Sequence, residues 1–271
     1  MKILLCLLLC LLLPSCSGVG PQQDARRSQP VAGAGGASPA SSHAVATRNN
    51  GLFTVKKVYD GDTVLLEDGR KIRLLGINTP EITHGKRPGE AGGEQAKSWL
   101  TNKLLNQPVR LEIGVENTDK FGRTLAHVFN AQNDSINLQL VALGMASVDI
   151  FPPNLAYAEQ LTAAERQAES NRLGIWQMPE YAPIAIERLV AAKPHGWTRV
   201  IGKITAVQAT PHGVNLEFSD LFTARIEQRN VPLFGDLNNY TNKTVEVRGW
   251  IQPRKGHPVM LLRHPSAIKR Q

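Results

Sequence analysis

The sequence predicts a mainly β protein with packed helices, an α+β chain that holds two small barrels. Short segments rich in β-branched and aliphatic residues are separated by turn residues, and amphipathic helical segments lie between them. A second run of strand-like segments follows a Pro-containing stretch at residues 179–183. With 271 residues, of which 42% are hydrophobic, the chain is long enough for each barrel to bury its own core.

The first sixteen residues have the pattern of an export signal. Lys2 precedes an apolar run, residues 3–13, and Cys16 follows after a Pro-Ser pair. A run of eleven apolar residues is too short to cross a bilayer, whose hydrocarbon core needs ~20. Residues 13–16 resemble a bacterial lipobox, in which the cysteine is acylated and becomes the mature N-terminus. The alternative is an ordinary cleaved signal with an incidental cysteine.

By this resemblance, residues 1–16 are a lipoprotein signal peptide, and a lipid on Cys16 would anchor the chain to a membrane. Ser17 stands where an aspartate would signal retention, which favours the outer membrane of the cell envelope. All three cysteines lie in the signal segment, so we expect no disulfide in the mature chain. Residues 17–50 are rich in Gly, Ala, Ser, Pro and Gln, and this composition predicts a disordered tether.

The first predicted domain comprises residues 51–182. Asp68 and Gly69 lie between two strand-like segments and give the signal of a two-residue hairpin. Two of the predicted helices end at glycines, Gly144 and Gly174. The predicted strands are 53–59, 63–67, 71–77, 109–115 and 124–131, and the predicted helices are 94–105, 135–143 and 155–173. Their order suits a five-stranded barrel with three packed helices, as in OB-folds.

The second predicted domain comprises residues 183–271. A short helix is expected at 184–191, and strands are expected at 198–207, 214–218, 222–228, 244–251 and 258–263. Five strands, with a non-strand segment between the third and fourth, again suit an OB-like barrel. The two halves show no convincing sequence repeat. Trp197, Phe222 and Trp250 are either stacking platforms for bases or core residues, and the core is the commoner place for aromatics in a small barrel.

The positive charge is concentrated in the second predicted domain. The chain has a formal net charge of +8, which makes a polyanionic partner plausible, either nucleic acid or an anionic membrane surface. Residues 183–271 hold 13 basic and 6 acidic side chains, whereas residues 51–182 hold 14 and 16. The excess of seven in the second domain fits nucleic-acid binding as well as it fits simple solubility.

Acidic and basic residues in the first domain are spaced so that they converge. Asp60 and Asp62 are two apart at the start of a strand, so they should point the same way. A two-residue hairpin at Asp68-Gly69 would set Asp62 opposite Leu75, with Arg73 as its diagonal neighbour. A purely structural ion pair would explain this pattern equally well.

The end of the next strand adds oxygen ligands and a candidate base. Asn78, Thr79 and Glu81 follow one another where the strand meets a proline. Hard cations such as Ca²⁺ take carboxylate, amide and carbonyl oxygens, and a carboxylate beside the ion can accept a proton from water. Arg123, before another strand, would supply a second guanidinium. Two arginines suit phosphodiester hydrolysis, because each can bind phosphate oxygens bidentately.

Four segments together resemble the staphylococcal nuclease family: VYDGDTVLLEDG, KIRLLGINTPE, TDKFGRTLAHVF and RLGIW. The resemblance implies cleavage of DNA or RNA with one Ca²⁺ and 3′-phosphate products. It assigns water activation to Glu81 and phosphate binding to Arg73 and Arg123. The implied ligands of the ion are Asp62, Asn78 and the Thr79 carbonyl, with Asp60 beside the ion but not in direct contact.

The sequence departs from the family pattern at two places. Asn78 stands where reference members have aspartate, so the metal site lacks one negative charge. Asp149 and Phe151 replace a tyrosine pair that stacks on and hydrogen-bonds the nucleotide in the family. Phe151 can still stack on a base, whereas Asp149 would repel a phosphate. Lys120 and Phe151 are candidate substrate contacts. The basic loop at residues 83–89 either binds backbone phosphates or is simply solvated.

Two other functions fit the same residues. A non-catalytic envelope protein that binds nucleic acid or another polyanion is the main alternative, and the missing carboxylate at Asn78 favours it. A third reading makes residues 183–271 an adhesin for an anionic surface or the cell wall. The seven histidines show no zinc-binding spacing, and no obligate protein partner is evident.

Overall fold

The computed structural model describes residues 48–192, 196–220, 222–254 and 257–271. The predicted signal peptide, its Cys16 and the predicted tether up to residue 47 lie outside these residues. Within the described ranges, no helix combines the length and the apolar character that crossing a membrane requires.

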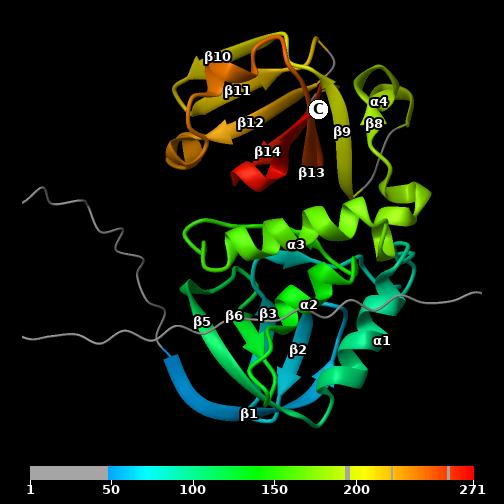
Figure 1. Ribbon diagram of the computed structural model, residues 1–271, viewed down its shortest axis with the longest axis vertical. Helices are drawn as coiled ribbons and strands as arrows, with labels where there is room; N and C mark the ends of the chain where they lie inside the picture. Colours follow the sequence, from blue (N-terminus) through cyan, green and yellow to red (C-terminus); the bar gives the residue numbers. More distant parts are fainter. Residues whose placement is uncertain (1–47, 193–195, 221, 255–256) are drawn as a thin grey trace, which may run out of the picture. The chain divides into compact units, whose positions relative to one another are not determined.

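The first half folds as a closed five-stranded barrel (Figure 1), as the sequence predicts. Its strands follow the order β1-β2-β3-β6-β5, in which β3 and β6 are parallel and the other pairs antiparallel. The strands are β1 (Arg48–Val58), β2 (Thr63–Leu66), β3 (Lys71–Leu74), β5 (Pro108–Thr118) and β6 (Thr124–Phe129). β1 begins inside the segment for which the composition predicts disorder.

The hairpin between β2 and β3 has a different register from the predicted one. Thr63 pairs with Arg73, so the predicted pairing of Asp62 with Leu75 is wrong by one residue. The connection is a three-residue loop closed by Leu66, whose N–H donates to the Arg70 carbonyl at 2.9 Å. Gly69 adopts a φ of 89° in this loop, a conformation that glycine reaches without steric cost.

The predicted strand 71–77 is interrupted. Gly76 has a φ of 74°, which turns the chain out of the barrel. The next residues form β4 (Ile77–Asn78), which pairs with β7 (Ser147–Val148) in a separate two-stranded sheet. This turn carries Asn78 away from the barrel wall and toward the segment that ends at Asp149.

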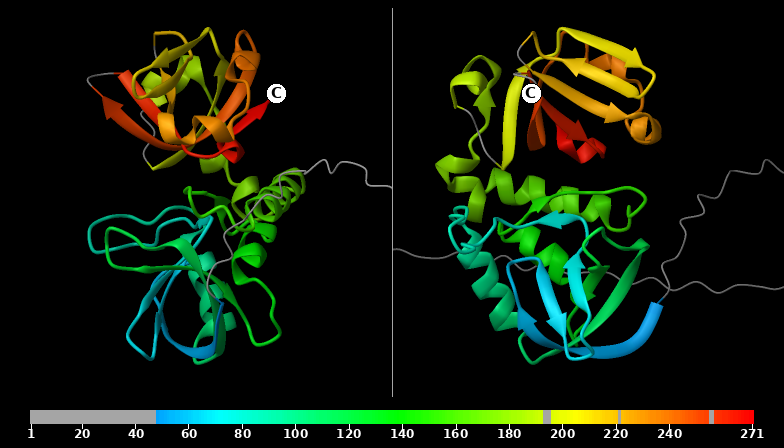
Figure 2. Two further views of the ribbon diagram at one scale, coloured as in Figure 1. Left: turned by 90° about the vertical axis from the view of Figure 1, so that its left-hand side faces the viewer. Right: turned by 180° about the vertical axis from the view of Figure 1, so that it is seen from behind.

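Three helices pack on the barrel (Figure 2): α1 (Gly93–Leu104), α2 (Ile136–Ala142) and α3 (Ala158–Ser170). Ser135 caps α2, because its hydroxyl accepts the Leu138 N–H at 3.2 Å. α3 begins later than the predicted residue 155, after Tyr157 in a left-handed conformation. Two short 3₁₀ helices follow, at Gly174–Gln177 and Pro179–Tyr181. One buried cluster, which includes Val64, Leu100 and Leu140, joins the barrel to α1 and α2.

The second half is a β domain whose strand order is β10-β11-β12-β14-β13-β9-β8, and β15 pairs with β13. β9 and β10 follow one another closely in the chain, so the order from β10 to β9 repeats that of the first barrel, with β12 and β14 parallel as β3 and β6 are. β8 adds a second parallel pair, with β9. The elements are β8 (Ile184–Ala185), α4 (Ile186–Ala192), β9 (Trp197–Lys203), β10 (Ala206–Thr210), β11 (Gly213–Glu217), β12 (Thr223–Glu227), β13 (Thr244–Arg254), β14 (His257–Leu262) and β15 (Ile268–Arg270), with 3₁₀ helices at Gln228–Leu233, Leu237–Tyr240 and Pro265–Ala267.

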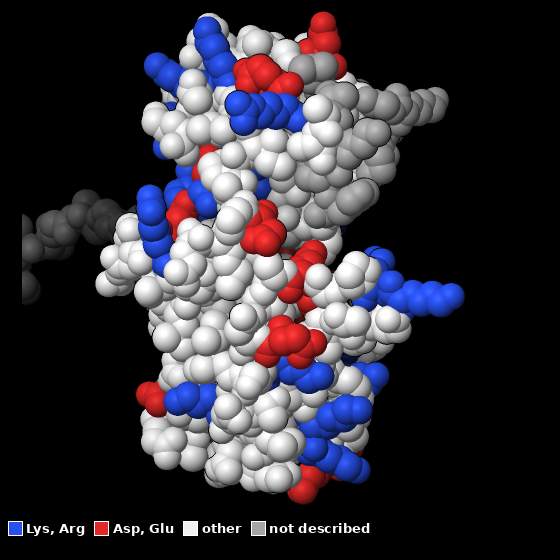
Figure 3. All heavy atoms as spheres, turned by 90° about the vertical axis from the view of Figure 1, so that its right-hand side faces the viewer, with Lys and Arg blue, Asp and Glu red and all other residues white. Residues whose placement is uncertain are grey.

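The aromatics of this second domain are mainly core residues. Phe222 is fully buried and Trp197 is 8% exposed, so the core reading is the correct one for both. Trp250 is partly buried beside Trp197. On the face in Figure 3, Lys and Arg side chains stand among Asp and Glu side chains. Carboxylates therefore interrupt the positive charge on that face.

A buried ionic cluster joins α3 to the second domain. Arg248 on β13 lies 3.0 Å from the Glu165 carboxylate on α3, and Arg199 on β9 pairs with Glu169 on α3. α3 thus lies between the first barrel and the second domain, as Figure 1 shows. The cluster comprises Arg199, Arg248 and Lys269 together with Glu165, Glu169 and Glu246.

Candidate active site

The loop between β1 and β2 brings two carboxylates next to α1 and Thr79. The Asp62 N–H donates to the Asp60 carboxylate at 3.0 Å, which holds the turn. A Cβ on Gly61 would lie 2.7 Å from the Ala96 Cβ and from the Thr79 hydroxyl oxygen. Only glycine therefore lets this loop pack so closely against its neighbours.

The Asp62 carboxylate connects three segments of the first barrel. One of its oxygens accepts the Thr79 N–H at 3.0 Å and lies 3.1 Å from the Arg73 guanidinium. The other accepts the Thr63 hydroxyl at 3.2 Å. The predicted proximity of Asp62 and Arg73 is confirmed despite the wrong register. Asp62 lies before β2, and the long arginine side chain reaches it.

The oxygen-bearing groups suit a hard cation. Burial and the neighbouring Asp62 carboxylate raise the pKa of Asp60 to about 6, so these two carboxylates repel each other, and a bound cation would relieve that repulsion. Asn78 is 8% exposed. In the described part of the chain, no group of three or more His, Cys, Asp or Glu side chains could hold a metal. The predicted ligands, the Asp62 carboxylate, the Asn78 amide and the Thr79 carbonyl, with the Asp60 carboxylate beside them, form a calcium-type set.

Glu81 is held by its backbone next to this set. Its N–H donates to the Glu90 carboxylate at 3.0 Å, and its carbonyl accepts the Glu90 N–H at 2.7 Å. Gly93 packs against the same carbonyl, where a Cβ would lie only 2.4 Å from the oxygen. The side chain is partly exposed. Glu81 is two residues beyond Thr79, within about 7 Å along the chain.

Arg123 is linked to the Asp62 carboxylate through Thr63. Its Nε donates to Asp119 at 2.7 Å, and its Nη1 donates to the Thr63 hydroxyl at 3.4 Å. Thr63 in turn donates to Asp62, so one chain of contacts runs from Arg123 to Arg73 through Thr63 and Asp62. Lys120 is exposed on the turn before Arg123.

Asp149 and Phe151 lie directly after β7. Burial raises the pKa of Asp149 to about 6, Arg263 and Arg73 oppose this shift, and the Asp62 charge adds to it. Asp149 is therefore close enough to Arg73 and Asp62 to interact with both electrostatically. Phe151 is 44% exposed, and the Arg263 guanidinium carbon lies 4.4 Å from the centre of its ring.

Three residues of this region were not singled out from the sequence. Thr63 links Arg123 to Asp62, and the only sequence signal for it was its place after the Asp-Gly-Asp triplet. Glu90 anchors the Glu81 backbone from nine residues away, with no recognisable spacing. Arg263 comes from the second domain, and no pattern within the first domain points to it.

Comparison with known proteins identifies the family of the first barrel. The family described as staphylococcal nuclease homologue matches residues 71–178. The thermonuclease of Staphylococcus intermedius is 37% identical over 128 residues, which are 46% of this chain and 76% of that protein. The thermonuclease of Staphylococcus hyicus is 33% identical over 141 residues, 51% of this chain and 83% of that protein.

A more distant relative is a probable endonuclease of Colletotrichum graminicola, 29% identical over 140 residues, which are 49% of this chain and 50% of the fungal protein. The family match begins at β3 and ends before β8, so it covers Arg73 and Arg123 but neither Asp62 nor the second domain. Together, the matches and the barrel show that the chain belongs to the staphylococcal nuclease family and is a nuclease.

Proposed function

We propose that the first barrel hydrolyses phosphodiester bonds of DNA or RNA in a calcium-dependent reaction and leaves 3′-phosphate ends. The observation that carries this proposal is the chain of contacts from Arg73 through Asp62 and Thr63 to Arg123. It brings two cationic side chains around the buried Asp62 carboxylate, in the barrel that also carries Glu81. Hydrolysis of a phosphodiester needs this combination: positive charge to stabilise the phosphate oxygens and a base to deprotonate the attacking water.

The two arginines bind the phosphate group. Asp119 holds Arg123 through Nε, which leaves its Nη2 without a partner among the described residues. Arg73 is 16% exposed in its side chain and donates from Nη1 to the Leu74 carbonyl at 2.8 Å. Their guanidinium groups neutralise charge that develops on the phosphate oxygens as the attacking water adds.

Glu81 acts as the general base. A water molecule attacks phosphorus in line with the 5′-oxygen, and Glu81 takes its proton on a carboxylate oxygen. The bond from phosphorus to the 5′-oxygen breaks, and the leaving oxygen gains a proton from solvent. Two hydrogen bonds with Glu90, one to its carboxylate and one from its N–H, fix the backbone of Glu81, so that backbone needs little ordering when substrate binds.

Ca²⁺ is the proposed cofactor. Asp62, Asn78 and the Thr79 carbonyl would hold it with Asp60 nearby, and when bound it would supply positive charge to the phosphate. The amide of Asn78 makes a weaker electrostatic contribution than a carboxylate. We therefore propose that this site binds Ca²⁺ less tightly than a site with aspartate at the same position.

The test is a nuclease assay on plasmid DNA and on RNA, with Ca²⁺, Mg²⁺ and chelator side by side. Glu81→Gln should lower kcat by about 10²–10⁴-fold. The matched control is Glu67→Gln, which removes an exposed carboxylate on the β2–β3 loop and should leave the rate unchanged. Wild-type rates in Glu81→Gln, or full turnover in chelator, would refute the mechanism.

Asn78→Asp probes the metal site in the same assay. It adds a negative charge to the ligand set, so half-maximal activity should need less Ca²⁺ than in the wild type. An unchanged calcium requirement would remove Asn78 from the set of ligands.

We further propose that a lipid on Cys16 tethers the enzyme to the outer membrane. The support is the sequence pattern alone, residues 13–16 after the apolar run. Cys16→Ser should release the protein from the membrane fraction, and mass spectrometry of the mature wild-type N-terminus should show an acylated cysteine. An N-terminus without lipid would refute this.

A further inference from the structure

An arginine of the second domain lies against the proposed substrate-binding edge of the nuclease barrel. Arg263 directly follows β14, and its guanidinium carbon lies 4.4 Å from the centre of the Phe151 ring. No carboxylate among the described residues lies within ion-pair distance of it. Its planar group covers one face of the ring, and its N–H donors remain available to an anionic ligand.

The segment that Arg263 contacts is connected directly to the nuclease site. β7 pairs with β4, and Ser147 lies opposite Asn78 in that pair. The Asp149 N–H then donates to the Gly76 carbonyl at 3.0 Å. Asp149 and Phe151 therefore extend the edge that begins at Asn78.

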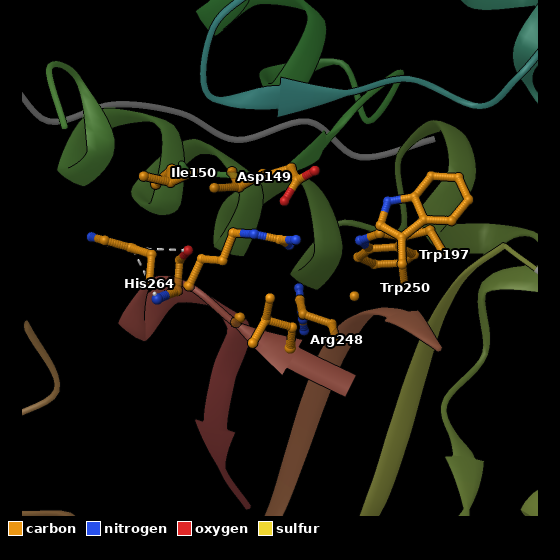
Figure 4. Close-up of a pocket in the computed structure, with 12 residues that line it drawn as sticks. Asp149, Ile150, Trp197, Arg248, Trp250 and His264 are labelled. Atoms are coloured by element: carbon orange, nitrogen blue, oxygen red, sulfur yellow. Dashed lines mark hydrogen bonds between the residues drawn. The ribbon is translucent and has the colours of Figure 1, made fainter. Parts of the chain in front are cut away.

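Asp149 and Arg263 also line one pocket at the junction with the second domain (Figure 4). Val148, Arg248, Trp250 and His264 complete much of its wall. In Figure 4 the Asp149 carboxylate points into the pocket. Arg263 lines the same pocket, so its positive charge offsets the carboxylate that would otherwise repel a phosphate on this side of the barrel.

The second domain is held in a fixed place relative to this edge. One oxygen of Glu165 on α3 accepts the Val148 N–H at 2.7 Å, and the other lies 3.0 Å from Arg248 on β13. A single carboxylate therefore bonds both the strand before Asp149 and the strand that pairs with β14. These bonds therefore fix the position of Arg263 relative to Phe151.

We propose that Arg263 binds a phosphate of the polynucleotide next to the one being cleaved, so that the nuclease site is composed of residues from both domains. This inference rests on the proposed nuclease site. A guanidinium stacked on an aromatic ring suits a nucleic-acid strand, because it offers donors to a phosphate and a planar face to a base. The second domain then contributes to substrate affinity and takes no part in the chemical step.

The test compares Arg263→Ala with the wild type on heat-denatured DNA and on a dinucleotide that holds a single phosphodiester. On DNA, KM should rise about tenfold with kcat unchanged, because one charge-assisted contact is lost from binding. On the dinucleotide, KM should stay the same. The dependence of log KM on log salt concentration should become shallower by about 0.7.

Arg229→Ala is the matched control. It removes an arginine of the same domain whose side chain is 76% exposed and pairs with Glu227, and it should change neither KM nor the salt dependence. Arg263→Lys keeps the charge and should recover part of the affinity on DNA. Circular dichroism and Tm of each variant establish that it is folded.

If folded Arg263→Ala keeps the wild-type KM and salt dependence on DNA, the inference is overturned. The proposed nuclease function is unaffected by that result as long as the wild type is active. An equal rise of KM on DNA and on the dinucleotide would also overturn it. Failure of the proposed function itself would look different: the wild type would cleave neither substrate at any Ca²⁺ concentration.

Discussion

His127 is a buried residue whose charge state affects stability but not the proposed chemistry. It is 3% exposed on β6, and its ring lies 4.7 Å from the Tyr157 ring. Burial lowers its pKa from 6.5 to about 4, and Glu112 and the Ala156 backbone oppose this only in part. The folded protein therefore keeps His127 neutral at a pH where the unfolded chain binds a proton.

This difference predicts a loss of stability in mild acid. Because the folded pKa is depressed, unfolding takes up a proton as pH falls from about 6.5 to about 4, and stability decreases over that window. Between pH 7 and pH 5, His127 should lower the free energy of unfolding by about 2 kcal/mol. Urea unfolding of wild type and His127→Leu at several pH values, in chelator, measures the difference.

The comparison with His127→Leu isolates the contribution of the histidine to the pH dependence of stability. Asp60 and Asp149, whose pKa values are raised to about 6, change stability in the opposite direction and are present in both proteins. The free-energy difference between the two proteins should therefore vary with pH by the histidine contribution alone. A difference that stays constant from pH 7 to pH 5 would contradict the assignment.

At the scale of elements, the sequence predicted the positions of the strands more accurately than their pairing. The β-branched segments predicted all five strands of the first barrel, and the amphipathic segments and helix-ending glycines predicted its three helices. These predictions succeed because the periodicity of apolar residues shows which face of an element is buried. Register depends on the turn. The Asp68 side chain accepts the Arg70 N–H at 3.0 Å, and this local bond belongs to a three-residue loop that the dipeptide signal does not distinguish.

The convergence of site residues was more robust than the register that suggested it. Asp62 and Arg73 come together although Thr63, not Asp62, is close to Arg73 in the strand pairing. Arg263 was beyond prediction for a different reason. It is more than one hundred residues from Phe151 in sequence, and the contact depends on how two separately folded sets of strands pack on α3.

At the scale of the whole described region, the two domains share a buried ionic cluster. Arg199, Arg248 and Lys269 face Glu165, Glu169 and Glu246, so the formal charges balance. Burial raises the pKa of Glu165, and Arg248 opposes that shift. Charges buried in this way are stable only as a complete set.

Removing one member should therefore destabilise both domains. Arg248 has a side chain only 1% exposed and contacts three carboxylates. Arg248→Met keeps most of the side-chain volume but leaves those carboxylates without their central cation, which should cost about 3–5 kcal/mol. Guanidinium unfolding followed by tryptophan fluorescence measures this, because Trp176 and Trp197 lie at the junction. Arg229→Ala, which breaks an exposed pair, should cost less than about 1 kcal/mol.

The double variant Arg248→Met with Glu165→Gln separates lost pairing from lost packing. If an uncompensated buried carboxylate causes the damage, making Glu165 neutral should restore part of the stability. Its amide oxygen can still accept the Val148 N–H, so the strand before Asp149 keeps its anchor. No recovery, or a single variant as stable as the wild type, would show that the cluster does not hold the domains together. The fixed position of Arg263 beside Phe151 would then lose its physical basis.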